Sequence, residues 1–171
     1  MFKFDLSRIF VTSYCFIGIF SCSTENPASP VCRVEPQQQQ NIQANAGCLI
    51  RINDEMITIE HRLTDKLDIP GGTSEGNESA QCTAHRETWQ ETGFNVEVGK
   101  LLGVKDNGFR FYQCQLSGDF TGKIKQFPVP DWSADEVTAI KLKDPFVTRD
   151  TDWRYPDELI EIRAMFNQIE P

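Results

Sequence analysis

One segment limits the possible folds of this chain more than any other. It runs from Gly71 to Gly93 and opens with two glycines and a polar loop. From Ser79 to Thr92 the sequence has neither Gly nor Pro and consists of good helix formers, and Gly93 is placed to end the helix as a C-terminal cap. A glycine-rich loop that enters a helix directs free backbone N–H groups and the positive end of the helix dipole toward whatever the loop encloses.

Three polar residues share one face of the predicted helix. Glu87, Gln90 and Glu91 are spaced i, i+3 and i+4, so their side chains lie on the same side. Carboxylates this close repel one another unless a cation lies between them, and hard oxygen ligands select Mg²⁺ or Mn²⁺ over Zn²⁺. Loop and helix together indicate metal-assisted chemistry on a phosphate. The alternative is a solvated acidic helix face, which is common.

The segment resembles the Nudix box, G-x5-E-x7-R-E-U-x-E-E-x-G-U, in which U is a bulky aliphatic residue. The residues that keep the motif's spacing are Gly72, Glu78, Arg86, Glu87, Glu91, Gly93 and Phe94. Two positions depart from it: Thr88 stands where an aliphatic residue is usual, and Gln90 replaces the first Glu of the E-E pair. The resemblance implies an α/β fold, a Nudix-type α/β/α sandwich with a mixed sheet, in which the box forms a loop–helix–loop.

The same resemblance implies a reaction. Members of the family hydrolyse a nucleoside diphosphate linked to another group, usually with Mg²⁺. Carried over by position, Glu87 and Glu91 would be the catalytic residues and metal ligands, assisted by the Gly71 carbonyl. The metal would polarise the diphosphate and lower the pKa of an attacking water. One carboxylate would take the proton of that water, and Glu87 is the candidate.

Other residues of the box would support its shape. By resemblance, Glu78 and Arg86 pair across the motif, and the glycines Gly72 and Gly93 support its shape. Gln90 can accept a hydrogen bond from a metal-held water but brings no negative charge. It is therefore compatible with a weaker metal site, with a binding module that has lost turnover, or with a changed reaction.

Two residues outside the box are further candidates. Glu136 begins a predicted late strand and matches the place where many Nudix enzymes supply another metal-binding carboxylate, although it could equally be a surface acid. Arg62 follows the second predicted strand and could contact a phosphate, although an ordinary surface arginine is the more common case.

The charge and the metal-binding residue types exclude several classes of protein. Lys and Arg total 17 against 25 Asp and Glu, a formal charge of −8, and there is no basic stripe, which argues against binding a nucleic-acid polymer. Two His residues are too few for a multi-His zinc site, and no C-x-x-C pair occurs. The predicted partner is instead a small-molecule diphosphate, and the sequence is silent on oligomeric state.

The amino terminus reads as a targeting segment. Residues 1–21 carry Lys3 and Arg8 before an apolar run from Ile9 to Phe20 that is shorter than the ~20 residues of a membrane-spanning helix, as in a secretory signal peptide. The run leads into Cys22 in a pattern that resembles a bacterial lipobox. Lipidation of Cys22 would place the protein on the periplasmic face of a membrane. Ordinary cleavage near Ser21, giving a periplasmic protein, and an uncleaved anchor are the alternatives.

The remaining chain divides into a tether and one domain. Residues 22–45 contain three prolines and a run of four glutamines and are expected to form a flexible, solvated tether. Residues 46–171 are expected to form the Nudix domain. Cys32, Cys48, Cys82 and Cys114 permit two disulfides with three connectivities, with Cys32–Cys48 one of them, or buried free thiols.

Hydrophobic periodicity predicts the elements of this domain. Strands are expected in six segments and a second helix near the end of the chain, with Leu159, Ile162, Phe166 and Ile169 on one face. The strands are Cys48–Ile52, Glu55–Glu60, Lys66–Ile69, Val96–Val104, Phe109–Leu116 and Glu136–Leu142, and the helix is Asp157–Ile169.

These observations favour an exported Mg²⁺-dependent diphosphate hydrolase. The alternative is a catalytically weak, ligand-binding envelope lipoprotein on the same scaffold. A plain disulfide-stabilised interaction domain fits the cysteine content but leaves the box unexplained.

Overall fold

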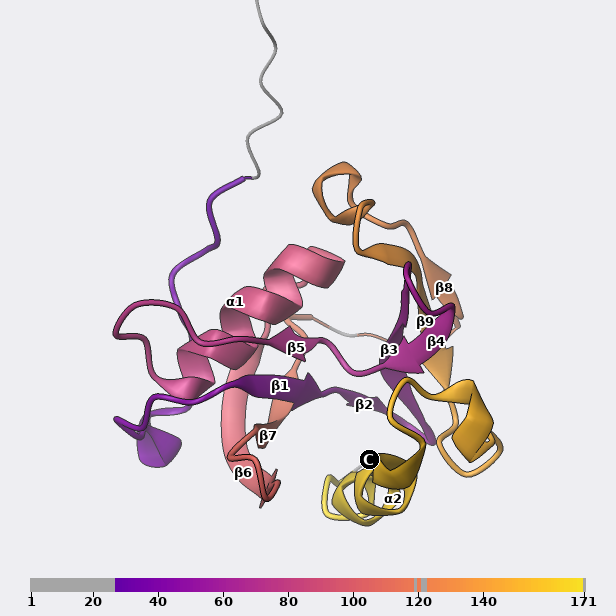
Figure 1. Cartoon of the computed structure of the whole chain (residues 1–171). Helices are drawn as coiled ribbons and strands as arrows, with labels where there is room; N and C mark the ends of the chain where they lie inside the picture. The colour runs from indigo at the N-terminus through magenta and orange to yellow at the C-terminus, as the bar shows by residue number, and fades with distance from the viewer. Residues whose placement is uncertain (1–26, 119, 121–122, 171) are drawn as a thin grey trace, which may run out of the picture.

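The computed structural model describes residues 27–118, 120 and 123–170, and shows two sheets between two helices (Figure 1). The predicted signal peptide over residues 1–21 and the lipidation site Cys22 lie outside the described residues. The strands are β1 Ala46–Leu49, β2 Arg51–Ile52, β3 Glu55–His61, β4 Lys66–Asp68, β5 Gly71–Gly72, β6 Glu97–Val104, β7 Arg110–Gln115, β8 Gln126–Phe127 and β9 Val137–Lys143. The helices are α1 Ala80–Thr92 and α2 Leu159–Phe166.

The first sheet is mixed and carries the strand that precedes the box loop. Its order is β5-β1-β7-β6, with β1 parallel to β7 and antiparallel to β5. The contact between β1 and β5 is so close that a Cβ on Gly71 would lie 2.5 Å from the Cα of Gly47. Glycine at Gly71 therefore allows the loop to start directly against the sheet.

The second sheet has the order β2-β3-β9-β8, and β4 pairs with β3. β2 and β3 form a hairpin whose turn contains Asn53 in the left-handed region, with φ of 56°, a conformation that Asn adopts more readily than most residues. The sequence analysis predicted neither β5 nor β8, which have two residues each, too few for a periodic pattern to be visible. The predicted strand Cys48–Ile52 is divided at Ile50 between β1 and β2, which lie in different sheets.

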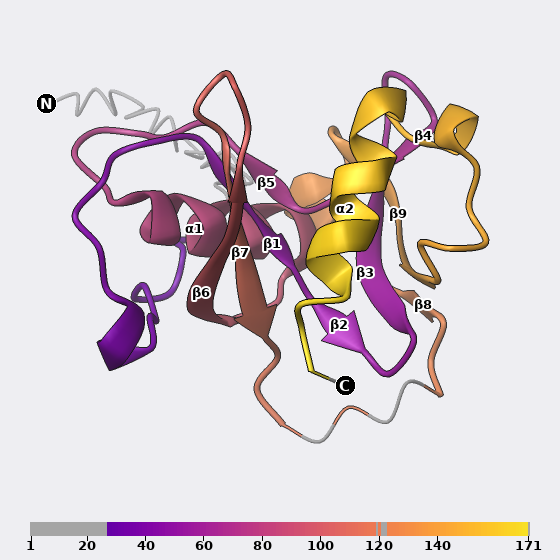
Figure 2. The same ribbon diagram turned by 90° about the horizontal axis from the view of Figure 1, so that it is seen from below.

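Each helix covers a different face of the strands, as Figure 2 shows from below. Along β1 the side chain of Cys48 joins the core cluster under α1, whereas its neighbour Leu49 joins the cluster under α2. β7 repeats the pattern with Tyr112 and Phe111. Successive strand side chains point to opposite faces, so these strands supply both layers of core. The expected α/β/α sandwich with a mixed sheet is confirmed.

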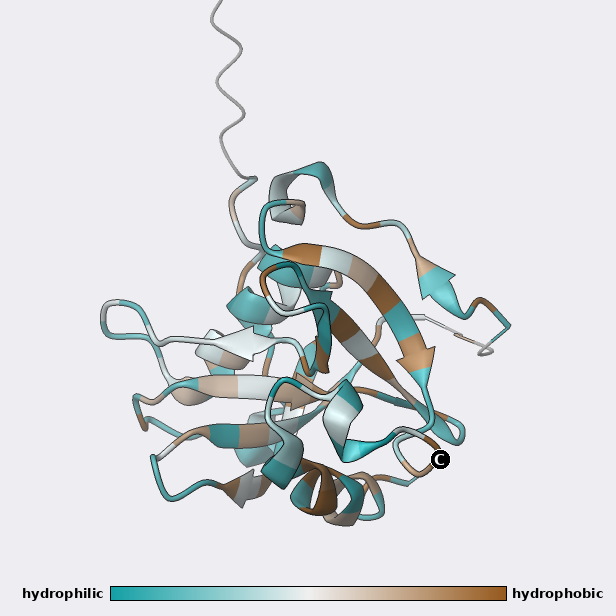
Figure 3. Ribbon diagram, turned by 45° about the vertical axis from the view of Figure 1, so that its right-hand side comes forward, coloured by the Kyte–Doolittle hydropathy of each residue, from teal (hydrophilic) through white to brown (hydrophobic). Residues whose placement is uncertain are grey.

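The second helix packs as predicted but is shorter. Leu159, Ile162, Phe166 and Ile169 are all buried in the cluster beneath it. Of the predicted helix Asp157–Ile169, the first two residues belong to a 3-10 turn, Pro156–Glu158, and α2 ends at Phe166 with Asn167 as its C-cap. Figure 3 shows hydrophobic residues concentrated on the strands and on α2, and hydrophilic residues in the loops.

The expectation of a flexible tether over residues 22–45 is wrong for its second part. Arg33 and Glu35 pair with Val98 at the edge of β6, with N–H···O distances of 2.9 Å in both directions. Beyond them the chain runs along the first turn of α1 and enters β1. The glutamines look like a solvated spacer by composition, but tertiary hydrogen bonds to buried partners hold this segment.

The four cysteines within the described residues all form disulfides, in the pairing Cys32–Cys82 and Cys48–Cys114. The Cys32–Cys48 pairing and the free-thiol alternative are therefore wrong. Cys48 and Cys114 lie on adjacent parallel strands inside the core, whereas Cys32–Cys82 joins the amino-terminal segment to α1. Across the described part of the chain, no helix combines the length and apolarity that crossing a bilayer requires.

Candidate active site

The box loop and its helix begin and end where the sequence predicts. Ser79 caps α1, its Oγ accepting a hydrogen bond from the Cys82 N–H at 3.3 Å. Gly93 ends the helix in the left-handed region with φ of 73°, and its N–H donates to the Trp89 carbonyl. Thr88, which departs from the family pattern, is fully buried and donates its hydroxyl hydrogen to the Ala84 carbonyl at 2.7 Å. This bond satisfies a polar group where an aliphatic residue is usual.

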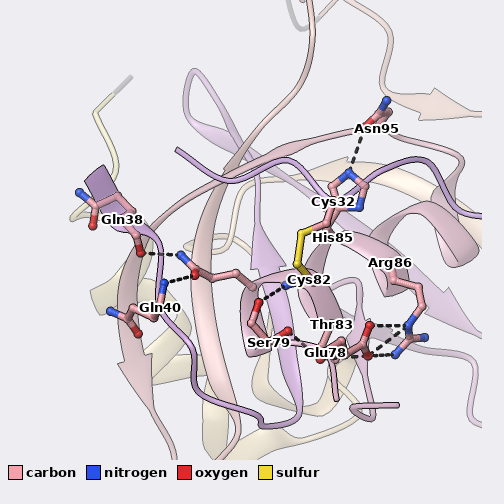
Figure 4. Close-up of a disulfide and its surroundings, with 11 residues drawn as sticks. Cys32, Gln38, Gln40, Glu78, Ser79, Cys82, Thr83, His85, Arg86 and Asn95 are labelled. Carbon is pink, nitrogen blue, oxygen red and sulfur yellow. Dashed lines mark hydrogen bonds and ion pairs between the residues drawn. A yellow bond between two sulfur atoms is a disulfide. The ribbon is translucent and has the colours of Figure 1, made fainter. Parts of the chain in front are cut away.

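Arg86 ties the loop to the helix. Its guanidinium donates to both carboxylate oxygens of Glu78, the closest contact being 2.7 Å from Nη2 to Oε1 (Figure 4). It also donates to the Thr73 carbonyl at 2.7 Å. Glu78 also accepts from the Glu75 N–H and the Thr83 hydroxyl. These bonds lower the pKa of Glu78 against the opposing effect of burial. The predicted pairing of Glu78 and Arg86 is present.

Glu87 lies directly against the glycines. A Cβ on Gly72 would be 2.5–2.6 Å from the carboxyl atoms of Glu87, so Gly72 leaves the space that this carboxylate occupies. Burial raises the pKa of Glu87, the neighbouring Arg86 opposes that shift at 2.9 Å, and Glu136 and Glu75 add to it.

Glu91 is the most deeply buried acid of the site. Its side chain is 8% exposed, and Oε2 accepts a hydrogen bond from the Gly71 N–H at 2.8 Å. Burial raises its pKa well above the ordinary value, the Gly71 bond opposes the shift, and the charges of Glu87, Asp68 and Glu136 raise it further. One turn of helix thus places Glu87 and Glu91 together above Gly71 and Gly72.

Gln90 faces Arg86. Its Oε1 accepts from Nη1 of Arg86 at 2.8 Å, the nitrogen that also donates to Glu87 at 2.9 Å. The amide therefore supplies an uncharged acceptor to a cation that Glu78 and Glu87 already neutralise.

The loop that carries Glu136 is held against the end of α1. Trp132 stacks on Trp89 with ring centroids 5.7 Å apart, and its Nε1 donates to the Gln90 carbonyl. Glu136 is exposed, yet its charge raises the pKa of both Glu87 and Glu91, which places it on the same side of the molecule. Arg62 instead donates to the Ala134 carbonyl at 2.6 Å, and so braces this loop.

A pocket of about 280 Å³ opens beside the glycines. Its wall includes Gly71, Gly72, Asp68 and Lys105, with Arg154 and Tyr155 on the far side. Arg154 contacts Asp68 at 3.4 Å and lies 5.2 Å from the Tyr155 ring centroid. Burial raises the pKa of Asp68 to about 6, although Arg154 and the Ile69 N–H oppose the shift.

Sequence analysis identified Gly71 and Gly72 but not the pocket residues Asp68, Lys105, Arg154 and Tyr155. Asp68 is the last residue of β4, just before the Nudix box, and this closeness in sequence was the signal that could have identified it. Lys105 and Arg154 come from the β6–β7 turn and from the segment before α2. No local pattern relates these two segments to the box.

Metal binding can be judged from the donors present. Within the described ranges, no group of three or more His, Cys, Asp or Glu side chains converges closely enough to hold a metal ion as the side chains stand. The chemistry of the donors nevertheless fits a hard divalent cation. A buried carboxylate at Glu91, with Glu87, Asp68 and Glu136 around it, is destabilised by its neighbours' charges, and a cation would relieve that repulsion.

Comparisons with known proteins agree with this arrangement. The sequence model of the protein family described as NUDIX domain matches residues 41–161 of this chain. A MutT-like protein of Streptomyces ambofaciens is 26% identical over 109 residues, which cover 61% of this chain and 71% of that one. A probable DHNTP pyrophosphohydrolase of Lactococcus lactis subsp. cremoris is 38% identical over 65 residues, covering 37% of this chain and 39% of that one. The structure of an ADP-ribose pyrophosphatase from Streptococcus suis superposes with a TM-score of 0.58 at 15% identity, covering 72% of this chain and 89% of that one.

Proposed function

This chain belongs to the Nudix family and is a Nudix hydrolase, and we propose that it uses Mg²⁺ to cleave the diphosphate linkage of a nucleoside diphosphate joined to another group, or of a related envelope diphosphate. The observation that carries the proposal is the pair Glu87 and Glu91, one helical turn apart over Gly71 and Gly72. Two relatives have pyrophosphohydrolase or pyrophosphatase in their names, which supports this reaction class.

The residues divide the work of this reaction. Glu87, Glu91, the Gly71 carbonyl and Glu136 would hold Mg²⁺, with Mn²⁺ as a substitute. The bound ion supplies Lewis-acid polarisation of the diphosphate and lowers the pKa of an attacking water. Glu87 is the proposed acceptor of the proton of that water, because burial raises its pKa and so makes it a better base. Arg86 and Glu78 keep the loop in place.

The pocket beside the glycines is the proposed substrate site. Tyr155 is 45% exposed, with Lys105 5.1 Å from its ring centroid. A flat ring can stack on Tyr155, while Lys105 and Arg154 supply positive charge for phosphate. A Tyr155→Ala variant is then expected to raise KM for a nucleotide substrate about tenfold and leave kcat nearly unchanged, whereas Tyr155→Phe keeps the wild-type KM.

The second candidate function is ligand binding without efficient turnover. The observation that favours it is Gln90, which brings no charge to the acidic face and bonds to Arg86. A Glu91→Gln variant separates the two functions. A hydrolase loses at least about 100-fold in kcat, because a charged metal ligand is gone, whereas a binding protein keeps its ligand affinity.

The decisive experiment is a screen of the full chain against nucleoside diphosphate sugars, dinucleotides and lipid diphosphates, with and without Mg²⁺. Release of phosphate or a monophosphate by the wild type, lost in Glu91→Gln, supports the proposal. Glu161→Gln is the matched control, since it removes the same charge from an exposed position on α2. Tight binding of a diphosphate with no product in any metal would contradict hydrolysis and favour the second candidate.

Export and lipidation complete the proposal. We propose that Cys22 is lipidated after removal of residues 1–21 and holds the enzyme at the periplasmic face of a bacterial membrane, where disulfides persist. Two disulfides in the described domain support an oxidising compartment. Membrane fractionation of a Cys22→Ala variant tests the anchor, and unchanged membrane retention would contradict it.

A further inference from the structure

Residues 32–43, called the strap below, run along the outside of the domain and reach the box helix at its first turn. The strap is joined covalently to α1 by the disulfide Cys32–Cys82 (Figure 4). Its next residues pair with Val98 at the edge of β6, so the strap connects the first sheet to the helix.

A buried glutamine on α1 holds the middle of the strap. Gln81 is 1% exposed. Its Nε2 donates to the Gln38 carbonyl and its Oε1 accepts from the Gln40 N–H, both at 2.8 Å. Figure 4 shows Gln38 and Gln40 meeting this side chain of the helix. A buried amide with both ends satisfied is a specific contact, because loss of either partner leaves a polar atom unpaired away from water.

The end of the strap reaches the box itself. The Ile42 carbonyl accepts from the Ala80 N–H at 2.6 Å, which satisfies one of the open donors at the start of α1. The side chain of Gln43 donates to the Gly76 carbonyl at 2.6 Å, in the polar loop between the glycines and the helix.

The loop has few other attachments. Arg86 and Glu78 hold it from inside, and the Asn45 side chain accepts from the Ser74 N–H at 3.0 Å. The strap therefore supplies the outer support of the loop and of the first turn of α1. The face of the helix that carries Glu87 and Glu91 begins just beyond this turn.

We propose that the strap is a positioning element for the hydrolysis, and that Cys32, Gln81 and Cys82 are positioning residues that hold the box loop and the start of α1 in the geometry that Glu87 and Glu91 need. This role depends on the hydrolysis proposed above. None of these residues lines the pocket beside the glycines, so they act through the helix and not on substrate.

The disulfide makes the strap sensitive to reduction. Cys48 and Cys114 are 0% and 2% exposed, whereas Cys32 and Cys82 are both partly exposed. A dithiol reductant therefore reaches Cys32–Cys82 first. The disulfide accepts two electrons and two protons to give two thiols, and the dithiol is oxidised to its own disulfide.

Hydrogen–deuterium exchange of the full chain tests the structural part without any substrate. In Cys32→Ser/Cys82→Ser and in Gln81→Ala, amides of residues 74–83 are expected to exchange at least about tenfold faster, while β3 and β9 keep their protection. Gln39→Ala, an exposed change on the same strap, is the matched control. Unchanged protection of residues 74–83 in both variants would overturn the proposal. If the cysteine variant fails to fold, Gln81→Ala alone decides.

Kinetics test the catalytic part with ADP-ribose, UDP-glucose and Mg²⁺ as probes. Cleavage of the strap disulfide by mild dithiol is expected to lower kcat about tenfold with KM within about twofold, and reoxidation with oxidised glutathione restores kcat. A parallel rise in KM, or no change in kcat on reduction, would contradict a positioning role. If the wild type hydrolyses neither probe, the proposed function is wrong for these substrates. The hydrogen–deuterium exchange result still supports or overturns the proposal that the strap holds the box loop and the start of α1.

Discussion

Asp68 illustrates how a buried acid of this site lowers the free energy of unfolding. Its pKa is raised to about 6 from 3.8 by burial, so between these pH values the folded state binds more protons than the unfolded state. The free energy of unfolding therefore falls as pH rises through this window, and Asp68 destabilises the fold by about 3 kcal/mol above pH 6. Glu91, whose pKa is raised well above its ordinary value, also lowers the free energy of unfolding when it is ionised.

An Asp68→Asn variant tests this account at the residue scale. It is expected to be more stable than the wild type by about 1–3 kcal/mol at pH 7.5, with the difference disappearing near pH 4. Urea unfolding at the two pH values in the absence of divalent metal measures it. Asp157→Asn serves as the control, because Asp157 is exposed in the 3-10 turn before α2. If the unfolding free energy depends on pH in the same way in Asp68→Asn and in the wild type, Asp68 is not the group whose pKa is raised.

At the scale of elements, the loop and helix of the box form one unit through Arg86. The guanidinium contacts Glu78, Glu87, Gln90 and the Thr73 carbonyl together, and a lysine ammonium cannot match this forked geometry. An Arg86→Lys variant is expected to lose about 2 kcal/mol of unfolding free energy.

Urea unfolding compares Arg86→Lys with Arg149→Lys, whose ion pair with Asp152 lies on the surface. The surface variant is expected to show no measurable change. Equal effects of the two substitutions would contradict the special role of Arg86.

The elements that sequence predicted best are those with long local patterns. The helix from Ser79 and the hydrophobic face of α2 follow from periodicity and caps, which neighbouring residues determine. The strap, β5 and β8 were missed because long-range contacts stabilise them: the strap is held by hydrogen bonds to α1, β5 pairs with β1, and β8 pairs with β9. Within the site, the motif located Glu87 and Glu91, whereas Arg154 and Tyr155 join the pocket only through tertiary folding.

At the scale of the whole molecule, the two disulfides connect parts of the chain that are distant in sequence. Cys48–Cys114 spans 66 residues and links the parallel pair β1 and β7 at the centre of the first sheet. Cross-linking a loop of this length restricts the unfolded chain and stabilises the fold by about 4 kcal/mol in the chain-entropy account.

Loss of the central disulfide is therefore expected to destabilise the molecule as a whole. A Cys48→Ala/Cys114→Ala variant should lose about 4 kcal/mol of unfolding free energy in urea, and the loss should appear in both sheets by hydrogen exchange. An unchanged midpoint would contradict a structural role for this bond. This result would also distinguish the core disulfide from Cys32–Cys82, for which the exchange effect is expected to be local.

The most direct test of the central claim is an anomalous diffraction map of crystals of the full chain soaked in Mn²⁺. We expect one strong peak about 2.1 Å from carboxylate oxygens of both Glu87 and Glu91, beside the Gly71 carbonyl, and its loss in Glu91→Gln. A map with no peak there, in which Glu91 still accepts from the Gly71 N–H and Glu87 still pairs with Arg86, would contradict the claim.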